Sequence, residues 1–133
     1  MQKLKDRFRP INTDGNPAFI FGRKAESKAA DYLKKQGYRI LNRNYNCRFG
    51  EIDIIAKKAE TICFVEVKAR INLDFGPPAV FVTSKKQNRI KKTAFCFIKD
   101  ECSKDFNYRF DVISVIKDQK GILKIELIEG AFE

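Results

Sequence analysis

Three ionisable residues stand out because they lie within apolar segments that resemble strands. Asp53 lies in GEIDIIA, at residues 50–56, and Glu66 and Lys68 lie in FVEVK, at residues 64–68. Side chains alternate between the two faces of a strand, so Glu66 and Lys68 should share a face, about 6.6 Å apart. If the two strands pair as a hairpin, Asp53 can lie beside Glu66. The spacing therefore predicts two carboxylates and one ammonium on one patch of an apolar sheet.

This patch suggests metal chemistry. Two neighbouring carboxylates in an apolar setting repel each other, and a divalent cation relieves the repulsion. Mg2+, or Mn2+ in its place, prefers carboxylate, water and phosphate oxygens. Bound by Asp53 and Glu66, it would polarise a phosphodiester and lower the pKa of a bound water, while Lys68 positions that water or stabilises the developing charge. Glu26 projects from the apolar side of an expected helix and could complete the metal site.

The same residues also have structural interpretations. A Glu-x-Lys pair on a strand is most often a surface ion pair worth about 0 to 1 kcal/mol. Glu26 could pair with Arg23 or Arg43 at the edge of its helix. Asp111, in the apolar segment RFDVI, fits a structural role better than a catalytic one, through pairing with Arg109 or a neighbouring basic group.

Hydrophobic periodicity predicts two helices. The first is expected over about residues 23–36, with an apolar side made of Ala25, Ala29, Ala30, Tyr32 and Leu33. The second is expected over about residues 83–99, where Ser84 and Gln87 have the spacing of a capping box. Its buried side should consist of Ile90, Ala94, Phe97 and Ile98.

Five strands are expected, over residues 38–42, 52–56, 62–70, 109–116 and 122–128. The link between the second and third strands is short enough for a hairpin. The order α-β-β-β-α-β-β predicts a single mixed α/β domain. We expect this domain to span residues 19–133 and residues 1–18 to form a flexible basic arm.

The charge balance favours an anionic partner. The chain has 27 Lys and Arg against 17 Asp and Glu, a net charge of +10. Nucleic acid is the first candidate and an anionic membrane surface the second, although a basic surface is also found on proteins with neither partner. Candidate phosphate contacts are the helical row Lys85, Arg89 and Lys92, with Arg70 at the edge of the site. Further candidates lie on the loop expected before the Asp53 strand: Arg43, Tyr45 and Arg48. No base-reading motif is present, so binding should be structure-selective or nonspecific.

Composition excludes several other classes. The chain has no histidine, which rules out a Ser-His-Asp triad, a Cys-His pair and a histidine base. Its four cysteines form no CxxC pair, so a zinc site would be hard to build. No apolar run approaches the roughly 20 residues of a membrane span, and no secretory signal is evident. We therefore expect a cytoplasmic protein without a membrane partner.

The order of the motifs carries a family resemblance. The pattern G-x-x-A-E, GEIDIIA, FVEVKAR, K-x-Q and RFDVI, across about residues 19–116, resembles the YraN-like family of small bacterial proteins. That family looks like a branch of the PD-(D/E)XK (restriction-endonuclease-like) nuclease superfamily, close to archaeal Holliday-junction resolvases. The resemblance implies a restriction-endonuclease-like core, a mixed central sheet flanked by helices, and a metal-dependent endonuclease acting on DNA, including branched or junction DNA.

The resemblance also implies roles for individual residues. Asp53, Glu66 and Lys68 correspond to the metal-binding Asp and the E-x-K element, and Glu26 to the helix-borne acid of resolvase-like members. The carbonyl of Val67 corresponds to an additional metal ligand. Gln87 corresponds to a helix-borne glutamine near the nucleic acid in some exonuclease-like relatives. One departure is Ile52, which stands where the superfamily pattern has proline.

Two alternatives to a nuclease remain open. One is a non-catalytic nucleic-acid-binding module with the same fold, which would need the basic face and not the carboxylates. The other is a scaffold that uses an apolar surface. Resolvase-like relatives are often dimers, so the resemblance is also compatible with a homodimer.

Overall fold

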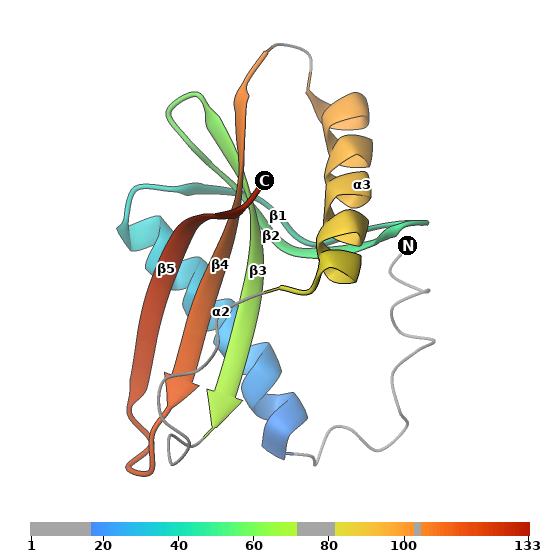
Figure 1. Ribbon diagram of the computed structural model, residues 1–133. Coiled ribbons are helices and arrows are strands. Elements are labelled where there is room, and N and C mark those ends of the chain that lie inside the picture. Colours follow the sequence, from blue (N-terminus) through green and yellow to red (C-terminus); the bar gives the residue numbers. More distant parts are fainter. Residues whose placement is uncertain (1–16, 72–81, 103–104) are drawn as a thin grey trace.

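The computed structural model describes residues 17–71, 82–102 and 105–133 (Figure 1). The elements are, in order, α2 (Pro17–Lys35), β1 (Arg39–Cys47), β2 (Gly50–Lys58), β3 (Thr61–Ile71), α3 (Ser84–Glu101), β4 (Asn107–Lys117) and β5 (Leu123–Phe132). This is the predicted order, and the α/β fold class is confirmed. The expected basic arm lies almost entirely outside the described residues.

The five strands form one sheet in chain order. Strands β3 and β4 run parallel, and the other neighbouring pairs run antiparallel. The parallel pair requires the chain to cross from one end of the sheet to the other between β3 and β4, and α3 lies within that crossover. The sheet is therefore mixed, as predicted.

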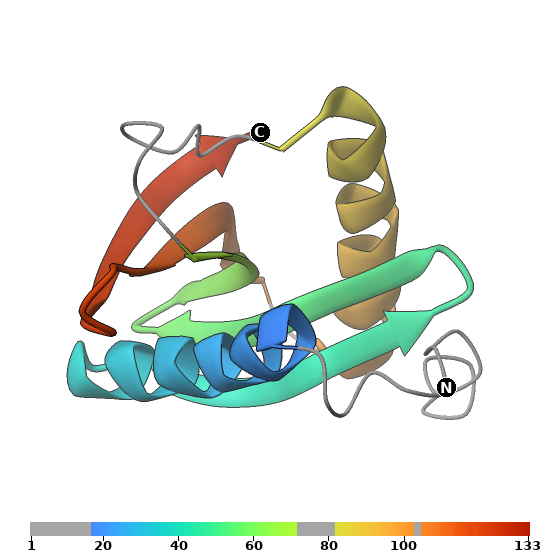
Figure 2. The same ribbon diagram turned by 90° about the horizontal axis from the view of Figure 1, so that it is seen from below.

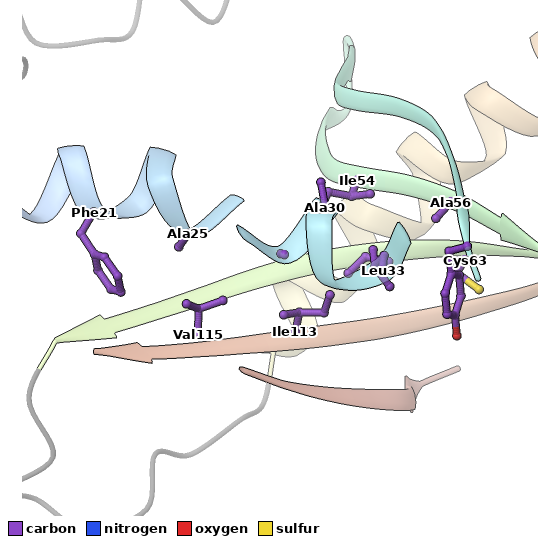
Figure 3. Close-up of a cluster of buried hydrophobic side chains, with 12 residues drawn as sticks. Phe21, Ala25, Ala30, Leu33, Ile54, Ala56, Cys63, Ile113 and Val115 are labelled. Carbon is purple, nitrogen blue, oxygen red and sulfur yellow. The ribbon is translucent and has the colours of Figure 1, made fainter. Parts of the chain in front are cut away.

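The two helices cover opposite faces of the sheet (Figures 1 and 2). Successive buried residues of a strand alternate between the two sides, as in β3, where Cys63 and Val65 face α2 while Ile62 and Phe64 face α3. Figure 3 shows the α2 side, where small helical residues allow the helix to lie close to the strands. Its buried members are Phe21, Ala25, Ala29, Ala30, Leu33, Tyr38, Ile54, Ala56, Cys63, Val65, Ile113 and Val115.

The α3 side contains the larger aromatic residues. Its buried members are Ile52, Ile55, Ile62, Phe64, Val82, Ile90, Ala94, Phe97 and Val112. The predicted buried sides of both helices are confirmed, with Tyr32 and Ile98 only partly buried. Because each helix has one apolar stripe and the sheet has two apolar faces, this layering buries both stripes.

Helix α2 begins at Pro17, six residues before the expected start. Proline suits the first turn of a helix, where its missing N–H would have no intrahelical partner. Phe21 is only 6% exposed and lies one turn before Ala25 on the same side. Burial of this ring against the sheet stabilises the extra turns. The apolar side predicted from Ala25 onward did not indicate that the helix starts earlier.

The start of α3 differs from the predicted capping box. Thr83, and not Ser84, is the N-cap, and its Oγ1 accepts a hydrogen bond from the Lys86 backbone N–H at 3.2 Å. The Gln87 side chain donates from Nε2 to the carbonyl oxygen of Val82 at 2.7 Å. The Ser84–Gln87 box is therefore wrong by one position, because Thr83 has the extended backbone that a cap requires.

Candidate functional site

The site lies where strands β2 and β3 separate. The two strands pair from Lys58 and Thr61, across a two-residue turn, to Ile54 and Val65. Beyond this point β3 continues beside β4, and β2 continues beside β1. Ile52 belongs to the α3 cluster and Ile54 to the α2 cluster, although they are two residues apart in one strand. Strand β2 therefore turns away from β3 around the residue between them.

Asp53 is that residue, and its carboxylate accepts a backbone hydrogen bond that a paired strand would otherwise accept. Its Oδ2 atom accepts a hydrogen bond from the Val67 backbone N–H at 2.8 Å. The N–H and C=O of one residue point to the same side of an antiparallel ladder, so the Val67 carbonyl also faces the fork. The predicted hairpin and the predicted approach of Asp53 to the E-x-K segment are both present.

A pocket of about 320 Å³ opens at the fork. Three predicted acids, Asp53, Glu66 and Glu26, contribute to its wall from β2, β3 and α2. The complete lining is Glu26, Gly50, Glu51, Asp53, Glu66, Val67, Lys86, Arg89 and Ile90. Lys68 is partly buried on β3 and is not part of this lining. The structure thus brings the predicted carboxylates together and leaves the predicted catalytic lysine at the edge.

Acidic side chains crowd one another in this pocket. Burial is the main cause that raises the pKa of Asp53 well above its ordinary value, followed by the charge of Glu66 and a hydrogen bond with its carboxyl group. The Val67 N–H acts in the opposite direction, and Glu26 adds a smaller upward effect. Glu66 itself is only 6% exposed. Ionising Asp53 beside the Glu66 carboxylate is therefore costly unless a cation neutralises the charge.

Lys86 supplies one such cation and was missed at the sequence level. Its Nζ forms an ion pair with Glu66 Oε2, and Lys86 also lines the pocket. The sequence did indicate this position, because Lys86 precedes the buried Ile90 by four residues and therefore lies on the same, inward side of α3. The exposed row of basic residues on the same helix was the stronger pattern.

The donor set fits a divalent cation in chemical type. Asp53 and Glu66 line the pocket with carboxylate oxygens, the hard ligands that Mg2+ prefers, and Val67 lines it beside them. Among residues 17–71, 82–102 and 105–133, no group of three His, Cys, Asp or Glu side chains is arranged closely enough to hold a metal ion. The ammonium group of Lys86 lies at Glu66, so the arrangement is already one that attracts positive charge.

Asp111, by contrast, has a structural role. It is fully buried, and Arg109 donates to both of its oxygens, from Nε to Oδ1 at 2.8 Å and from an Nη to Oδ2 at 2.9 Å. The Gly130 N–H also donates to Oδ1, at 2.9 Å, and Arg109 donates to the Tyr38 hydroxyl at 2.8 Å. The predicted pairing of Asp111 with Arg109 is confirmed.

Comparison with known proteins places the chain in a family. The family model described as "Uncharacterised protein family UPF0102" matches residues 25–115. This chain is a member of the UPF0102 family. It is 47% identical over 112 residues to a UPF0102 protein of Caldicellulosiruptor saccharolyticus, covering 84% of this chain and 95% of the relative. A UPF0102 protein of Caldicellulosiruptor bescii is 52% identical over 113 residues, with the same coverage, and one of Syntrophus aciditrophicus is 47% identical over 112 residues, covering 84% and 87%.

The matched region of this UPF0102 protein contains the whole acidic pocket and its basic wall. The family resemblance inferred from the motifs is confirmed at this level. The family description and the names of these relatives state no activity, so a function has to be inferred from the site itself. In the described part of the chain, no helix is long and apolar enough to cross a membrane.

The predicted nucleic-acid contacts of the UPF0102 protein divide into two groups. Members of the first group are exposed; they are Lys85, Arg89 and Lys92 on α3, Arg48 at the β1–β2 turn and Arg70 near the end of β3. Arg89 also lines the pocket. These residues are available to a phosphate backbone.

Members of the second group are engaged within the protein. An Nη of Arg43 donates to the Ser27 hydroxyl at 3.3 Å. The Tyr45 ring packs edge-on against Phe97, with centroids 5.4 Å apart. Gln87 is held by its hydrogen bond to the start of α3. Tyr45 and Gln87 therefore have structural contacts in the free protein, whereas Arg43 remains exposed. Arg43 and Tyr45 lie on β1, and not on the loop predicted before the Asp53 strand.

Proposed function

We propose that this UPF0102 protein is a metal-dependent nuclease that hydrolyses phosphodiester bonds in DNA. The observation that carries the proposal is the pair of adjacent carboxylates, Asp53 and Glu66, facing a wall of α3 that bears Lys86 and Arg89. Carboxylates attract a hard cation, and basic side chains attract phosphate. A pocket that offers both within about 320 Å³ suits a phosphodiester and a metal ion together.

The residues have complementary roles in this proposal. Asp53, Glu66 and the Val67 carbonyl would hold Mg2+ or Mn2+, and Glu26 would reach it through water. The bound ion would polarise the phosphodiester and lower the pKa of the attacking water. Lys68, two residues beyond Glu66 on β3, would orient that water or stabilise the charge that develops on the phosphate.

A cleavage assay tests the proposal directly. The purified full chain and the variant Asp53→Asn are incubated with linear duplex, single-stranded, flapped and four-way-junction DNA, in Mn2+, Mg2+ or EDTA. We expect cutting by the wild type only when metal is present, and no comparable cutting by the variant. Binding of DNA without cleavage of any form by the wild type, in either metal, would contradict the proposal.

A second candidate is a nucleic-acid-binding module without catalysis, and the ion pair between Lys86 and Glu66 favours it. This pair neutralises the buried Glu66 carboxylate without a metal ion. Such a module would bind DNA with a steep salt dependence, since phosphate contacts release counterions. Its binding would be the same in Mg2+ and EDTA and would never lead to cleavage.

Removing Lys86 should strengthen metal binding. In Lys86→Met the ammonium no longer competes for Glu66, and the Mg2+ affinity should rise about fivefold, which corresponds to the upper range for a partly exposed ion pair. Isothermal titration calorimetry without DNA measures this effect. Lys85→Met is the matched control, because Lys85 is the neighbouring lysine and does not line the pocket. Equal affinities in the two variants would show that Lys86 does not compete with the metal ion.

A further inference from the structure

The turn between β1 and β2 presents an aromatic ring beside the pocket. Phe49 is 36% exposed at this turn. The guanidinium carbon of Arg48 lies 4.8 Å from the ring centroid, and the Lys92 ammonium from α3 lies 5.9 Å from it. Single exposed apolar residues are common on protein surfaces. A ring approached by two cations from different elements is a more specific arrangement.

The turn that carries the ring packs against α3. In Figures 1 and 2 the end of the β1–β2 hairpin reaches the side of α3. Gly50 has φ +153°, and a Cβ there would lie 3.3 Å from Thr93 Oγ1 and 3.8 Å from Arg89 Cβ. The Phe49 N–H also donates to Cys47 Sγ at 3.4 Å. A Cβ at position 50 would therefore be in tight contact with Thr93, which shows how closely the turn packs against the helix.

The ring therefore lies next to residues of the acidic pocket. Gly50 and Glu51, the next two residues, both line the pocket, as does Arg89 on the adjoining surface of α3. A strand whose phosphate enters the pocket beside Arg89 could continue toward Lys92 and Arg48, the two cations that approach the Phe49 ring.

An exposed aromatic ring close to cations should bind unpaired bases in preference to bases within a duplex. Bases in a continuous duplex have both faces covered by their neighbours, whereas an unpaired base offers a free face. Stacking on an aromatic ring tolerates every base, and flanking cations hold the phosphates on either side. The arrangement suits a single strand and offers little to the interior of a duplex.

We propose that Phe49 is a stacking platform for an unpaired base of single-stranded DNA. The base would displace the Arg48 guanidinium or the Lys92 ammonium, which lie over the ring in the free protein, and these two cations would then bind the phosphates beside that base. The substrate class is DNA with a single-stranded segment at the site, such as a flap or an opened junction. The choice of substrate rests on the proposed nuclease function, but the binding itself requires neither metal nor cleavage.

The variant Phe49→Trp tests stacking by fluorescence. The chain contains no tryptophan, so the new side chain is the sole indole in the protein. Titration with single-stranded oligothymidylate in EDTA should quench its emission, because a stacked base quenches indole. Titration with a blunt duplex of the same length should leave the emission nearly unchanged. Quenching by the duplex alone, or by neither DNA, would overturn the proposal.

Binding constants give a second test. Phe49→Ala should weaken the binding of the single strand roughly thirtyfold, the mid-range effect of losing one base–aromatic contact, and change duplex binding little. Phe95→Ala is the matched control, since Phe95 is a more exposed phenylalanine on α3, at 65%, and does not line the pocket. An equal loss for both DNA forms, or in both variants, would overturn the proposal. Because these assays contain EDTA, absence of nuclease activity would not alter their outcome.

Discussion

Replacing Asp53 with asparagine is expected to lower the rate of metal-dependent DNA cleavage by more than about a hundredfold, the upper range seen for losing a residue that merely supports a metal ligand. Asparagine has nearly the same shape but lacks the negative charge that would hold the metal ion beside Glu66. Its amide oxygen can still accept the Val67 N–H that Asp53 now binds at 2.8 Å. The change therefore removes the proposed chemistry and preserves the local structure. Single-turnover cleavage of the preferred substrate measures it.

The same substitution should not destabilise the protein in EDTA. Burial and the charge of Glu66 raise the pKa of Asp53, so the folded state binds this proton more tightly than the unfolded state. As pH rises above the ordinary value of 3.8, the unfolded Asp53 ionises first, and the wild type loses stability until the pH passes the raised folded value. The asparagine side chain does not titrate and has no such loss, so the advantage of the variant in Tm should grow with pH across that window.

Glu51→Gln provides the control for both measurements. Glu51 lines the same pocket from the same strand, but it has no predicted role as a metal ligand. We expect its cleavage rate to stay within an order of magnitude of the wild type. Full cleavage by Asp53→Asn would exclude Asp53 as a ligand, and a marked fall in its Tm would make Asp53 a structural carboxylate.

The residues of β2 and β3 show which parts of the site the sequence can predict. Alternation along a strand is a local property, so the apolar runs around Asp53 and Glu66 revealed both acids as exceptions. The hairpin followed from the short link between the strands. These two local rules were sufficient to place Asp53 beside the E-x-K segment, and Val67 is the residue that it contacts.

The fork between the strands could not be predicted in the same way. Pairing between β2 and β3 ends at Ile54 and Val65, and the β1–β2 hairpin meets α3 at Gly50. The second contact joins segments that are far apart in the chain. Glu66 lines the pocket at the fork and Lys68 does not, and Lys86 reaches the Glu66 carboxylate from the following helix. The partners of long flexible side chains depend on the three-dimensional arrangement of the elements, which sequence spacing does not reveal.

Replacing Asp111 with alanine is expected to cost about 3 kcal/mol of folding free energy, the lower range for removing one partner of a buried ion pair. The change leaves the guanidinium of Arg109 without its two-point partner and the Gly130 N–H without its acceptor. Unfolding free energies of small proteins are roughly 5–15 kcal/mol, so this is a large effect. Urea denaturation in EDTA measures it, with Asp31→Ala as the control, because Asp31 is exposed on α2.

The double variant Arg109→Ala/Asp111→Ala separates the contribution of the ion pair from other effects of the Asp111 substitution. If Asp111 acts mainly through Arg109, then removing both side chains should cost less than the sum of the two single changes, since the guanidinium is no longer left without its buried partner. The Tyr38 hydroxyl also receives a hydrogen bond from Arg109, so some loss should remain. Additive losses would show that the two side chains act independently. Lost DNA cleavage in Asp111→Ala with unchanged unfolding free energy would instead make Asp111 part of the catalytic site, against the structural role that its buried hydrogen bonds support.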